Sequence, residues 1–439
     1  MSERNSTVES GGPVRFGASM RLHFNFASGY RPLNHGSFGT FPRAVQEYRF
    51  NVLREWEERE CISQVFDYPP RLKECRALVA PLLGADTDEV VFVPNATTGV
   101  NTVLRNLVYE RGDLIIYPET IYSSCRSTIE SLEETTPVRG HKIEVVYPIE
   151  DDELVDKFRA VAKGLAGEGY RIRVAVFDTI ISAPGVRMPW ERIVEACKEL
   201  SILSLIDGAH GIGHIDLTHT GKVKPDFLVT NCHKWLYVPR GCAVLYVPFA
   251  NQHLITTGFP TSHGYRPPSA RRSIPASKYF TELFLYGATV DLSTYLTVPA
   301  SLRFRREVCG GEAAIREYCA KLAREGGDMV ALALGTEVLD NRSGSLREGC
   351  AFATVRWPVP VDGEGGPSSA DMDKVIPWFY ATVTKEFDTY LQTFFYNGSI
   401  WTRLSAQVYL GMEDFEWAAR ILRIMSNRVK HGEWKDEEK

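Results

Sequence analysis

An acid and an amine stand at the ends of two apolar runs in the most informative stretch of the sequence. Asp207 closes the run LSLID, and Lys234 comes shortly after the run DFLVTN. Both runs have the length and composition of buried strands, and in open α/β sheets ligands bind beyond the carboxyl ends of the strands. We therefore expect Asp207 and Lys234 to emerge at one edge of a sheet.

Three kinds of chemistry fit this pair. The first is a plain ion pair, since charges at strand ends are mostly solvated. The second is a metal site of Asp207, His210 and His214, but this would need a helix, which the intervening glycines disfavour. The third is pyridoxal phosphate (PLP), because a neutral lysine amine bonds to its aldehyde and a carboxylate keeps its pyridine nitrogen protonated.

A phosphate cradle would favour the third interpretation, and residues 92–104 (FVPNATTGVNTVL) could supply one. The segment runs from a strand through Asn95 into a helix whose first turn carries Thr97 and Thr98. Free backbone N–H groups at a helix N-terminus bind anions, and threonine hydroxyls add donors. A simple helix cap at Asn95 would leave the same pattern, so both interpretations stay open here.

Four motifs together carry a family resemblance: NATTGV, VFDTIISAPGV, LIDGAHGIGH and NCHKWLYVPRGCAVLYVP. In this order they resemble the fold-type I, PLP-dependent enzymes of the class V aminotransferase group, which includes cysteine desulfurases and isopenicillin N epimerase. The likeness covers about residues 30–430. It is greatest to fungal members, namely the hercynylcysteine sulfoxide C–S lyase of ergothioneine biosynthesis and the PLP cyclase of loline alkaloid biosynthesis.

The resemblance implies roles for individual residues. Lys234 is the lysine that bonds to PLP, Asp207 is the partner of the pyridine nitrogen, and Tyr122 replaces the stacking histidine of the desulfurases. A tyrosine can both stack and donate a proton, so the desulfurase mechanism does not transfer directly. The remaining cofactor contacts implied are Thr97, Thr98, Ser182, His210, Thr230, His233 and, from the other subunit of a homodimer with shared active sites, Thr289.

The substrate side is expected to contain an arginine and an N-terminal loop. In the strand-like IWTRLSAQVY, alternation puts Arg403 on the polar face, where a guanidinium can hold a carboxylate through two parallel hydrogen bonds. A solvated surface arginine is the alternative. By resemblance Arg403 is the family's carboxylate clamp, and Asn34, His35 and Gly36 line the substrate side.

The elements that must position these residues alternate between strands and helices. Strands are predicted at 89–93, 113–117, 143–147, 173–177, 202–206, 226–229 and 242–247. Short apolar runs separated by helical segments indicate a mainly parallel sheet with helices on both faces. The fold class expected is α/β, with a seven-stranded sheet and a smaller C-terminal α+β domain.

The chain divides into three predicted parts: a flexible tail at 1–20, an N-terminal segment with the large PLP-binding domain at 21–295, and the small domain at 296–439. Helices are predicted at 44–59, 299–334, 372–386 and 414–428, a strand at 350–357 and a strand pair within 394–409. Residues 251–280 have no period and are predicted to be a lid or interface loop.

Composition excludes several functional classes. The chain has 439 residues and a formal charge of −5, without a basic run, so nucleic acid is not expected as a partner. No apolar stretch is long enough to span a membrane, which predicts a cytoplasmic protein. Nine cysteines without a CxxC pair argue against a disulfide framework.

The expected activity is that of a PLP-dependent C–S β-lyase acting on an S-substituted cysteine or its sulfoxide, with release of pyruvate and ammonia. Two alternatives stay open. One is a PLP-dependent cyclase or epimerase of secondary metabolism, which would begin with loss of the same α-proton. The other is a catalytically idle relative that serves as a binding protein.

Overall fold

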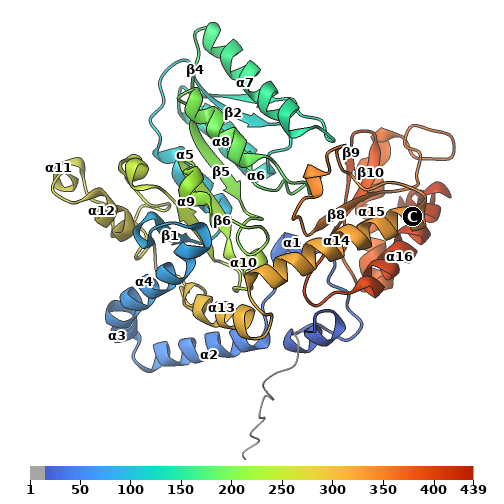
Figure 1. The fold of residues 1–439 in the computed structure, drawn as a ribbon, viewed down its shortest axis with the longest axis horizontal. Helices are drawn as coiled ribbons and strands as arrows, with labels where there is room; N and C mark the ends of the chain where they lie inside the picture. The colour runs from blue at the N-terminus through green and yellow to red at the C-terminus, as the bar shows by residue number, and fades with distance from the viewer. Residues whose placement is uncertain (1–14, 439) are drawn as a thin grey trace, which may run out of the picture.

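The computed structural model describes residues 15–438 (Figure 1). Its larger sheet has seven strands. The order across the sheet is β1-β7-β6-β5-β4-β2-β3. Its strands are β1 (Val90–Val93), β2 (Asp113–Pro118), β3 (Arg139–Ile143), β4 (Arg171–Asp178), β5 (Leu203–Gly208), β6 (Phe227–Asn231) and β7 (Ala243–Tyr246). Strand β7 runs antiparallel to both β1 and β6, and the other pairs are parallel, so the mainly parallel sheet is confirmed.

Both faces of this sheet are covered by helices, because successive strand residues alternate between two apolar clusters. In β6, Leu228 belongs to one cluster, together with residues of helices α7 and α8. Its neighbour Val229 belongs to the other cluster, together with residues of α5, α6 and α12. The predicted α/β fold class, with helices on both faces, is therefore confirmed.

A second, three-stranded sheet lies beside the first, with the order β8-β10-β9. Its strands are β8 (Phe352–Arg356), β9 (Gln392–Tyr396) and β10 (Ser399–Ser405), and all pairs are antiparallel. Helices α14, α15 and α16 accompany it on the side of the molecule away from α11 and α12 (Figure 1). This is the small α+β unit that the sequence predicts for the C-terminal third.

Sixteen α-helices and several short helical turns are described between residues 15 and 438. The α-helices are α1 (His35–Phe38), α2 (Arg43–Glu58), α3 (Glu60–Ile62), α4 (Tyr68–Val79), α5 (Ala96–Asn106), α6 (Ser123–Thr135), α7 (Asp151–Gly167), α8 (Trp190–Glu199), α9 (Thr220–Val223), α10 (Cys232–Trp235), α11 (Pro268–Arg271), α12 (Ala276–Leu283), α13 (Val298–Glu307), α14 (Glu312–Leu334), α15 (Met372–Phe387) and α16 (Met412–Lys430). None of the helices in this part of the chain is long and apolar enough to cross a membrane.

The predicted strand at 143–147 is wrong, because β3 ends at Ile143. This edge strand is formed by the polar residues RGHKI, which pair with β2 on one side. An edge strand does not need to be apolar on both faces, so an apolar run does not mark it. The apolar residues that follow, Val145 and Tyr147, are buried in the core as loop.

Two further predictions need correction. The single helix predicted at 299–334 is divided into α13 and α14, because Gly310 and Gly311 between them adopt positive φ angles of 76° and 97°. The loop predicted at 251–280 contains α11 and the start of α12, and Tyr279 and Phe280 of α12 are buried against the large sheet. A short helix with few apolar positions gives little periodic signal.

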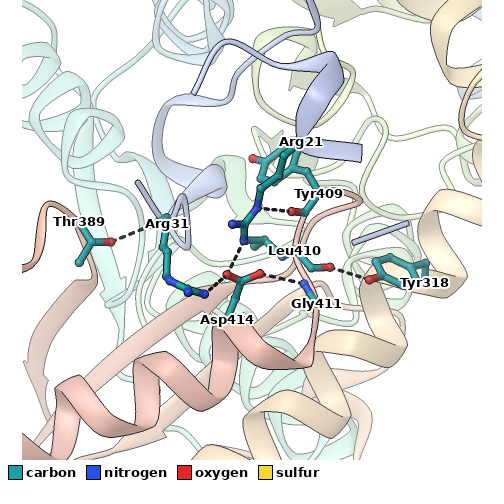
Figure 2. Close-up of polar contacts among 8 residues, drawn as sticks. All are labelled: Arg21, Arg31, Tyr318, Thr389, Tyr409, Leu410, Gly411 and Asp414. Atoms are coloured by element: carbon teal, nitrogen blue, oxygen red, sulfur yellow. Dashed lines mark hydrogen bonds and ion pairs between the residues drawn. The ribbon is translucent and has the colours of Figure 1, made fainter. Parts of the chain in front are cut away.

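The N-terminal segment of the described chain is fastened to the C-terminal unit by a buried carboxylate. Asp414 in the first turn of α16 forms ion pairs with Arg21 and Arg31, and its other oxygen accepts the Gly411 N–H at 2.9 Å (Figure 2). The side chain of Asp414 is fully buried. The carboxylate therefore caps its own helix and holds two points of the N-terminal segment at once.

The predicted flexible tail covers 1–20, of which 1–14 lie outside the described residues. Residues 17–20 are attached to the small unit: the Gly17 N–H donates to the Val408 carbonyl at 2.7 Å, and Met20 is buried in the core. The segment then continues across the small sheet, where the Ser405 N–H donates to the Leu33 carbonyl at 2.8 Å. This course brings residues 34–38 to the sheet edge that carries Lys234.

Candidate active site

The carboxyl ends of β1, β4, β5 and β6 open onto one cavity of about 200 Å³. The polar and aromatic residues that line it come from the strand ends, from α5 and α10 and from the N-terminal segment: Ser37, Phe38, Asn95, Thr97, Tyr122, Asp178, Ser182, Asp207, His210, Asn231, His233 and Lys234. A larger cavity of about 580 Å³ lies elsewhere, among Asp152, Arg192 and Ser343, but none of the residues assigned by the sequence lines it.

Lys234 lies in α10, directly after β6, as the sequence predicts. Burial, opposed by the charge of Asp207, lowers the pKa of its amine to about 8; Arg403 contributes to the lowering, and Asp178 opposes it. Its Nζ lies 3.3 Å from Nε2 of His210. At neutral pH a useful fraction of this amine is therefore unprotonated and can act as a nucleophile.

Asp207 at the end of β5 is buried and has two partners. Its Oδ1 accepts the Ala209 N–H at 2.9 Å, and its Oδ2 lies 3.4 Å from Sγ of Cys125 in α6. Burial raises the pKa of the Asp207 carboxyl, and the hydrogen bond from Ala209 and the charge of Lys234 oppose that shift. A cation placed beside it would hold it ionised, as a protonated pyridine ring nitrogen does.

Asp178 is a second buried acid that the sequence analysis did not assign. It ends β4 and stands in register with Asp207 on the neighbouring strand. The residue is 4% exposed, and no group of the described chain hydrogen-bonds its Oδ2. Burial, and then the negative charge of Asp207, raise its pKa well above the ordinary value. Its position directly after the apolar run RVAVF could have marked it as a candidate site residue, as the position of Asp207 after a similar run did.

The N-terminus of α5 lies where the sequence predicts an anion cradle. Asn95 caps the helix by accepting the Thr98 N–H at 2.8 Å, and Asn231 accepts the Ala96 N–H at 2.9 Å. Thr97 faces the cavity beside His233. Burial lowers the pKa of His233 to about 4, so the ring is neutral near pH 7 and can serve as a hydrogen-bond partner for an anion.

Arg403 of β10 is a buried cation without an acid partner. It is 1% exposed, and among residues 15–438 no carboxylate forms an ion pair with it. Nη1 donates to the Ser182 carbonyl at 2.5 Å, and Nη2 donates to Oδ1 of Asn34 at 3.0 Å. Burial lowers its pKa to about 10. A guanidinium in this setting is suited to binding an anion that arrives with a ligand.

The predicted N-terminal residues have different surroundings. Asn34 and His35 line a neighbouring cavity of about 390 Å³, which shares Phe38 with the first. His35 is a connector, since its Nε2 lies 2.6 Å from the Lys234 carbonyl oxygen and its Nδ1 lies 2.7 Å from the Tyr409 hydroxyl. At Gly36 a Cβ atom would stand 2.4 Å from the Phe352 ring, so the position admits glycine alone.

The structure brings together at one cavity most of the cofactor contacts implied by the sequence: Lys234, Asp207, Tyr122, Thr97, Ser182, His210 and His233. Three others lie differently. Thr230 donates to the Gly208 carbonyl and accepts the Ile212 N–H, Thr98 donates its hydroxyl to Asn95, and Thr289 lies on the surface beside Tyr286. Within one chain these three do not line the cavity.

A metal ion does not fit the Asp207, His210 and His214 set. Nδ1 of His210 accepts the indole N–H of Trp235, and Nε2 of His214 accepts the Ala351 N–H. Across residues 15–438 no group of three His, Cys, Asp or Glu side chains is placed to hold an ion. The two histidines act as structural hydrogen-bond partners instead.

Comparisons with known proteins agree on one family. Residues 58–258 match the model of the aminotransferase class-V family. The L-cysteine desulfhydrase-like protein lolT1 of Epichloe uncinata is 35% identical over 96% of this chain and 98% of its own length. The hercynylcysteine sulfoxide lyase of Schizosaccharomyces pombe is 31% identical over 93% of this chain and 97% of its own.

The fold has solved relatives at low sequence identity. A C-DES mutant with glycine covalently linked to its PLP cofactor superimposes with a TM-score of 0.71 over 92% of this chain and 98% of that chain, at 16% identity. The shared feature is the architecture described above, a mainly parallel seven-stranded sheet with a small second sheet. The comparisons by sequence thus show the family, and the comparison by structure shows the fold.

The lowered pKa of Lys234 predicts unusual reactivity for this amine. In protein without bound ligand, an amine-directed reagent should modify Lys234 with a half-maximal rate near pH 8, whereas a solvated lysine titrates near 10.4. The measurement is peptide mass mapping after short exposures across a pH series. Asp207→Asn should move the midpoint down, because Asp207 raises the pKa, and Arg403→Gln should move it up. An unshifted midpoint near 10 would contradict the assignment.

Proposed function

This chain belongs to the class V aminotransferase family, and on that premise we propose that it is a PLP-dependent C–S β-lyase. Its substrate would be an S-substituted cysteine or the corresponding sulfoxide. The observation that carries the proposal is the guanidinium of Arg403, which forms no ion pair with a carboxylate of the described residues. It lies beside the cavity that Lys234 and Asp207 line. Two relatives, a sulfoxide lyase and a desulfhydrase-like protein, bear names that support cleavage at sulfur.

The residues of the cavity fit PLP in three places. The amine of Lys234 can bond to the cofactor's aldehyde, and the carboxylate of Asp207 can hold the proton of the pyridine nitrogen. The N-terminus of α5 with Thr97, and the neutral ring of His233, can hold the phosphate. When bound, PLP supplies an electron sink for the pair of electrons left when a bond at Cα breaks.

The first task of the protein is to orient the amino acid. Arg403 binds the substrate carboxylate, and Asn34 and Ser37 hold the guanidinium in place from the N-terminal segment. The ring of Phe352 lies against the guanidinium, with Cζ of Arg403 4.4 Å from the ring centroid. A cation held on three sides by neutral groups keeps its charge free for the incoming anion.

The second task is to move the α-proton. The Lys234 amine, with its pKa lowered to about 8, takes this proton from Cα. The buried Asp207 keeps the opposite end of the cavity negative while the proton moves, so charge separation occurs between fixed groups and not in water.

The third task is to assist the leaving sulfur. We assign this to Tyr122, which lines the cavity at the start of α6 and is 44% exposed at its mouth. Its phenol would donate a proton to the sulfur atom as the Cβ–S bond breaks. Addition of water then gives pyruvate and ammonia, so that one S-substituted cysteine and one water yield one thiol, one pyruvate and one ammonia.

A homodimer is part of this proposal. Thr289 is exposed in one chain, and in a dimer with shared active sites the same residue of a second copy would reach the phosphate. Exposed apolar side chains at Phe66 and Val290 are consistent with a surface covered by a second copy. Sedimentation of the holoenzyme measures the oligomeric state, and a monomer with full activity would contradict shared sites.

The activity is tested with S-alkylcysteines, their sulfoxides and hercynylcysteine sulfoxide as candidate substrates. We expect pyruvate and thiol or sulfenate in equal amounts, Lys234→Gln inactive, and the exposed Lys222→Gln unchanged. If α-deuterium exchanges but pyruvate stays absent, a cyclase or epimerase takes the place of the lyase. If the protein neither absorbs visible light with PLP nor exchanges the α-proton, it is a binding protein.

The Arg403 clamp predicts a selective loss of affinity. Arg403→Lys keeps a cation but offers no fork, so KM should rise with little change in kcat, whereas Arg403→Ala should lower kcat/KM by roughly 10- to 150-fold, the range that corresponds to a charged hydrogen bond. Arg356→Lys, on the neighbouring strand β8 and paired with Glu337, is the matched control. For the parent enzyme and the Arg356 control, kcat/KM should be lower for a cysteine amide than for the corresponding free acid. In the Arg403 variants this difference should disappear.

The proposed role of the Tyr122 phenol predicts that its removal affects pyruvate formation but not α-deuterium exchange. In Tyr122→Phe the aromatic ring stays, so α-deuterium exchange should continue near the parent rate while pyruvate formation falls by about 10²- to 10⁴-fold, as expected for loss of a general acid. Tyr170→Phe, at a tyrosine of equal exposure outside the cavity, should change neither rate. Equal losses in both steps would remove Tyr122 from the role of leaving-group acid.

A further inference from the structure

We propose that Trp235 is a positioning residue that fixes the tautomer of His210, and that His210 in turn presents an N–H to the Lys234 amine and holds it as the free base. The relay runs Trp235, His210, Lys234 and links the last residue of α10 to the reactive amine of the same helix. The proposal rests on the proposed role of Lys234, and its test uses neither cofactor nor substrate.

The direction of each hydrogen bond follows from the donors available. The indole N–H of Trp235 lies 3.3 Å from Nδ1 of His210, and an indole nitrogen can donate but not accept. Nδ1 of His210 must therefore be the acceptor. A neutral imidazole with an accepting Nδ1 carries its proton on Nε2.

This proton is aimed at Lys234. Nε2 of His210 lies 3.3 Å from Nζ of Lys234, and an ammonium has three donors and no lone pair. Two donors facing each other would repel. The contact is completed when Lys234 is a neutral amine that accepts the Nε2–H, so the relay favours the form that can attack an aldehyde.

His210 is held in the neutral form that the relay needs. Burial lowers its pKa well below the ordinary value, and the charges of Lys234 and Arg403 lower it further. It lies in the turn after β5 and is almost completely buried. A second proton on this ring would place a cation between two other cations, which burial makes costly.

Trp235 cannot turn its N–H elsewhere. It is 2% exposed, and the His214 ring lies against it, tilted by 31°, with centroids 3.9 Å apart. His214 is itself fixed, since its Nε2 accepts the Ala351 N–H at 2.7 Å. A Cβ at Gly36 would already lie 3.4 Å from the Trp235 ring, and the Phe352 ring lies 5.4 Å away between centroids, so the indole is enclosed.

Two acids oppose the effect of the relay on the pKa of the Lys234 amine, and one cation supports it. Asp207 of β5 and Asp178 of β4 favour the ammonium, whereas burial and Arg403 of β10 favour the amine. Within residues 15–438, His210 is the one neutral side chain at hydrogen-bonding distance from Nζ of Lys234. Removal of its fixed N–H should therefore shift the balance toward the ammonium.

The experiment compares two tryptophans in protein without PLP. Trp235→Phe keeps an aromatic ring and removes the donor, so the pH midpoint for modification of Lys234 should rise and its rate at pH 7 should fall about three- to tenfold. Trp357→Phe is the matched control, because Trp357 is equally buried and donates to Thr402 in the small sheet. This control should leave the midpoint unchanged.

An equal shift in both variants, or no shift in a folded Trp235→Phe, would overturn the relay while leaving Lys234 as the reactive amine. A second measurement needs no folded variant of Trp235. In ¹⁵N-histidine-labelled parent protein, the ring assigned to His210 should show a bare Nδ1 and a protonated Nε2. A proton on Nδ1 would overturn the proposal directly.

Discussion

The site is built around a positive charge that has no acid to neutralise it. Removing an arginine from water costs several kcal/mol, and the terminal nitrogens of Arg403 offset this by donating to a carbonyl, an amide and a hydroxyl, with an aromatic ring against the guanidinium. These groups come from three distant parts of the chain. The Nε of Arg403 has no hydrogen-bond partner among the described residues. Glycine at 185 is required as well, since a Cβ there would lie 2.7 Å from Cδ of Arg403. The fold thus maintains a charge that becomes paired when an anion binds.

The N-terminal segment makes this arrangement possible, because it supplies Asn34 and Ser37 to the guanidinium. The segment is attached both to the small C-terminal unit and to the backbone at Lys234. Asp414 fixes Arg21 and Arg31 to α16, as Figure 2 shows, and His35 connects the Tyr409 hydroxyl to the Lys234 backbone. The large sheet, the segment and the small sheet therefore form one hydrogen-bonded unit around the cavity, and each contributes an oriented group that the others cannot supply.

Sequence patterns predicted the parts of this unit that have a local physical signal. Strands buried on both faces give apolar runs, so six of the seven strands of the large sheet were placed correctly, and the polar edge strand β3 was not. Lys234 and Asp207 were found because they follow such runs. Asp178 follows one too, but without a nearby partner in the sequence it had no apparent role. The contacts of Asp414 and Trp235 join residues far apart in the chain, or depend on ring orientation, and leave no periodic trace.

The placement of the charged residues at the cavity bears on how an amino acid would be oriented there. Asp178 and Asp207 stand in register at the ends of β4 and β5, and both of them, like the guanidinium of Arg403, act on the charge of Lys234. Arg403 supplies a positive charge, whereas burial raises the pKa of both acids, so a cation that binds beside them favours their ionised form. In the proposed reaction, the substrate carboxylate would point toward Arg403 of β10. The α-proton would then face the Lys234 amine, whose pKa burial lowers to about 8, so that orientation and proton transfer would follow from the same placement of charged groups.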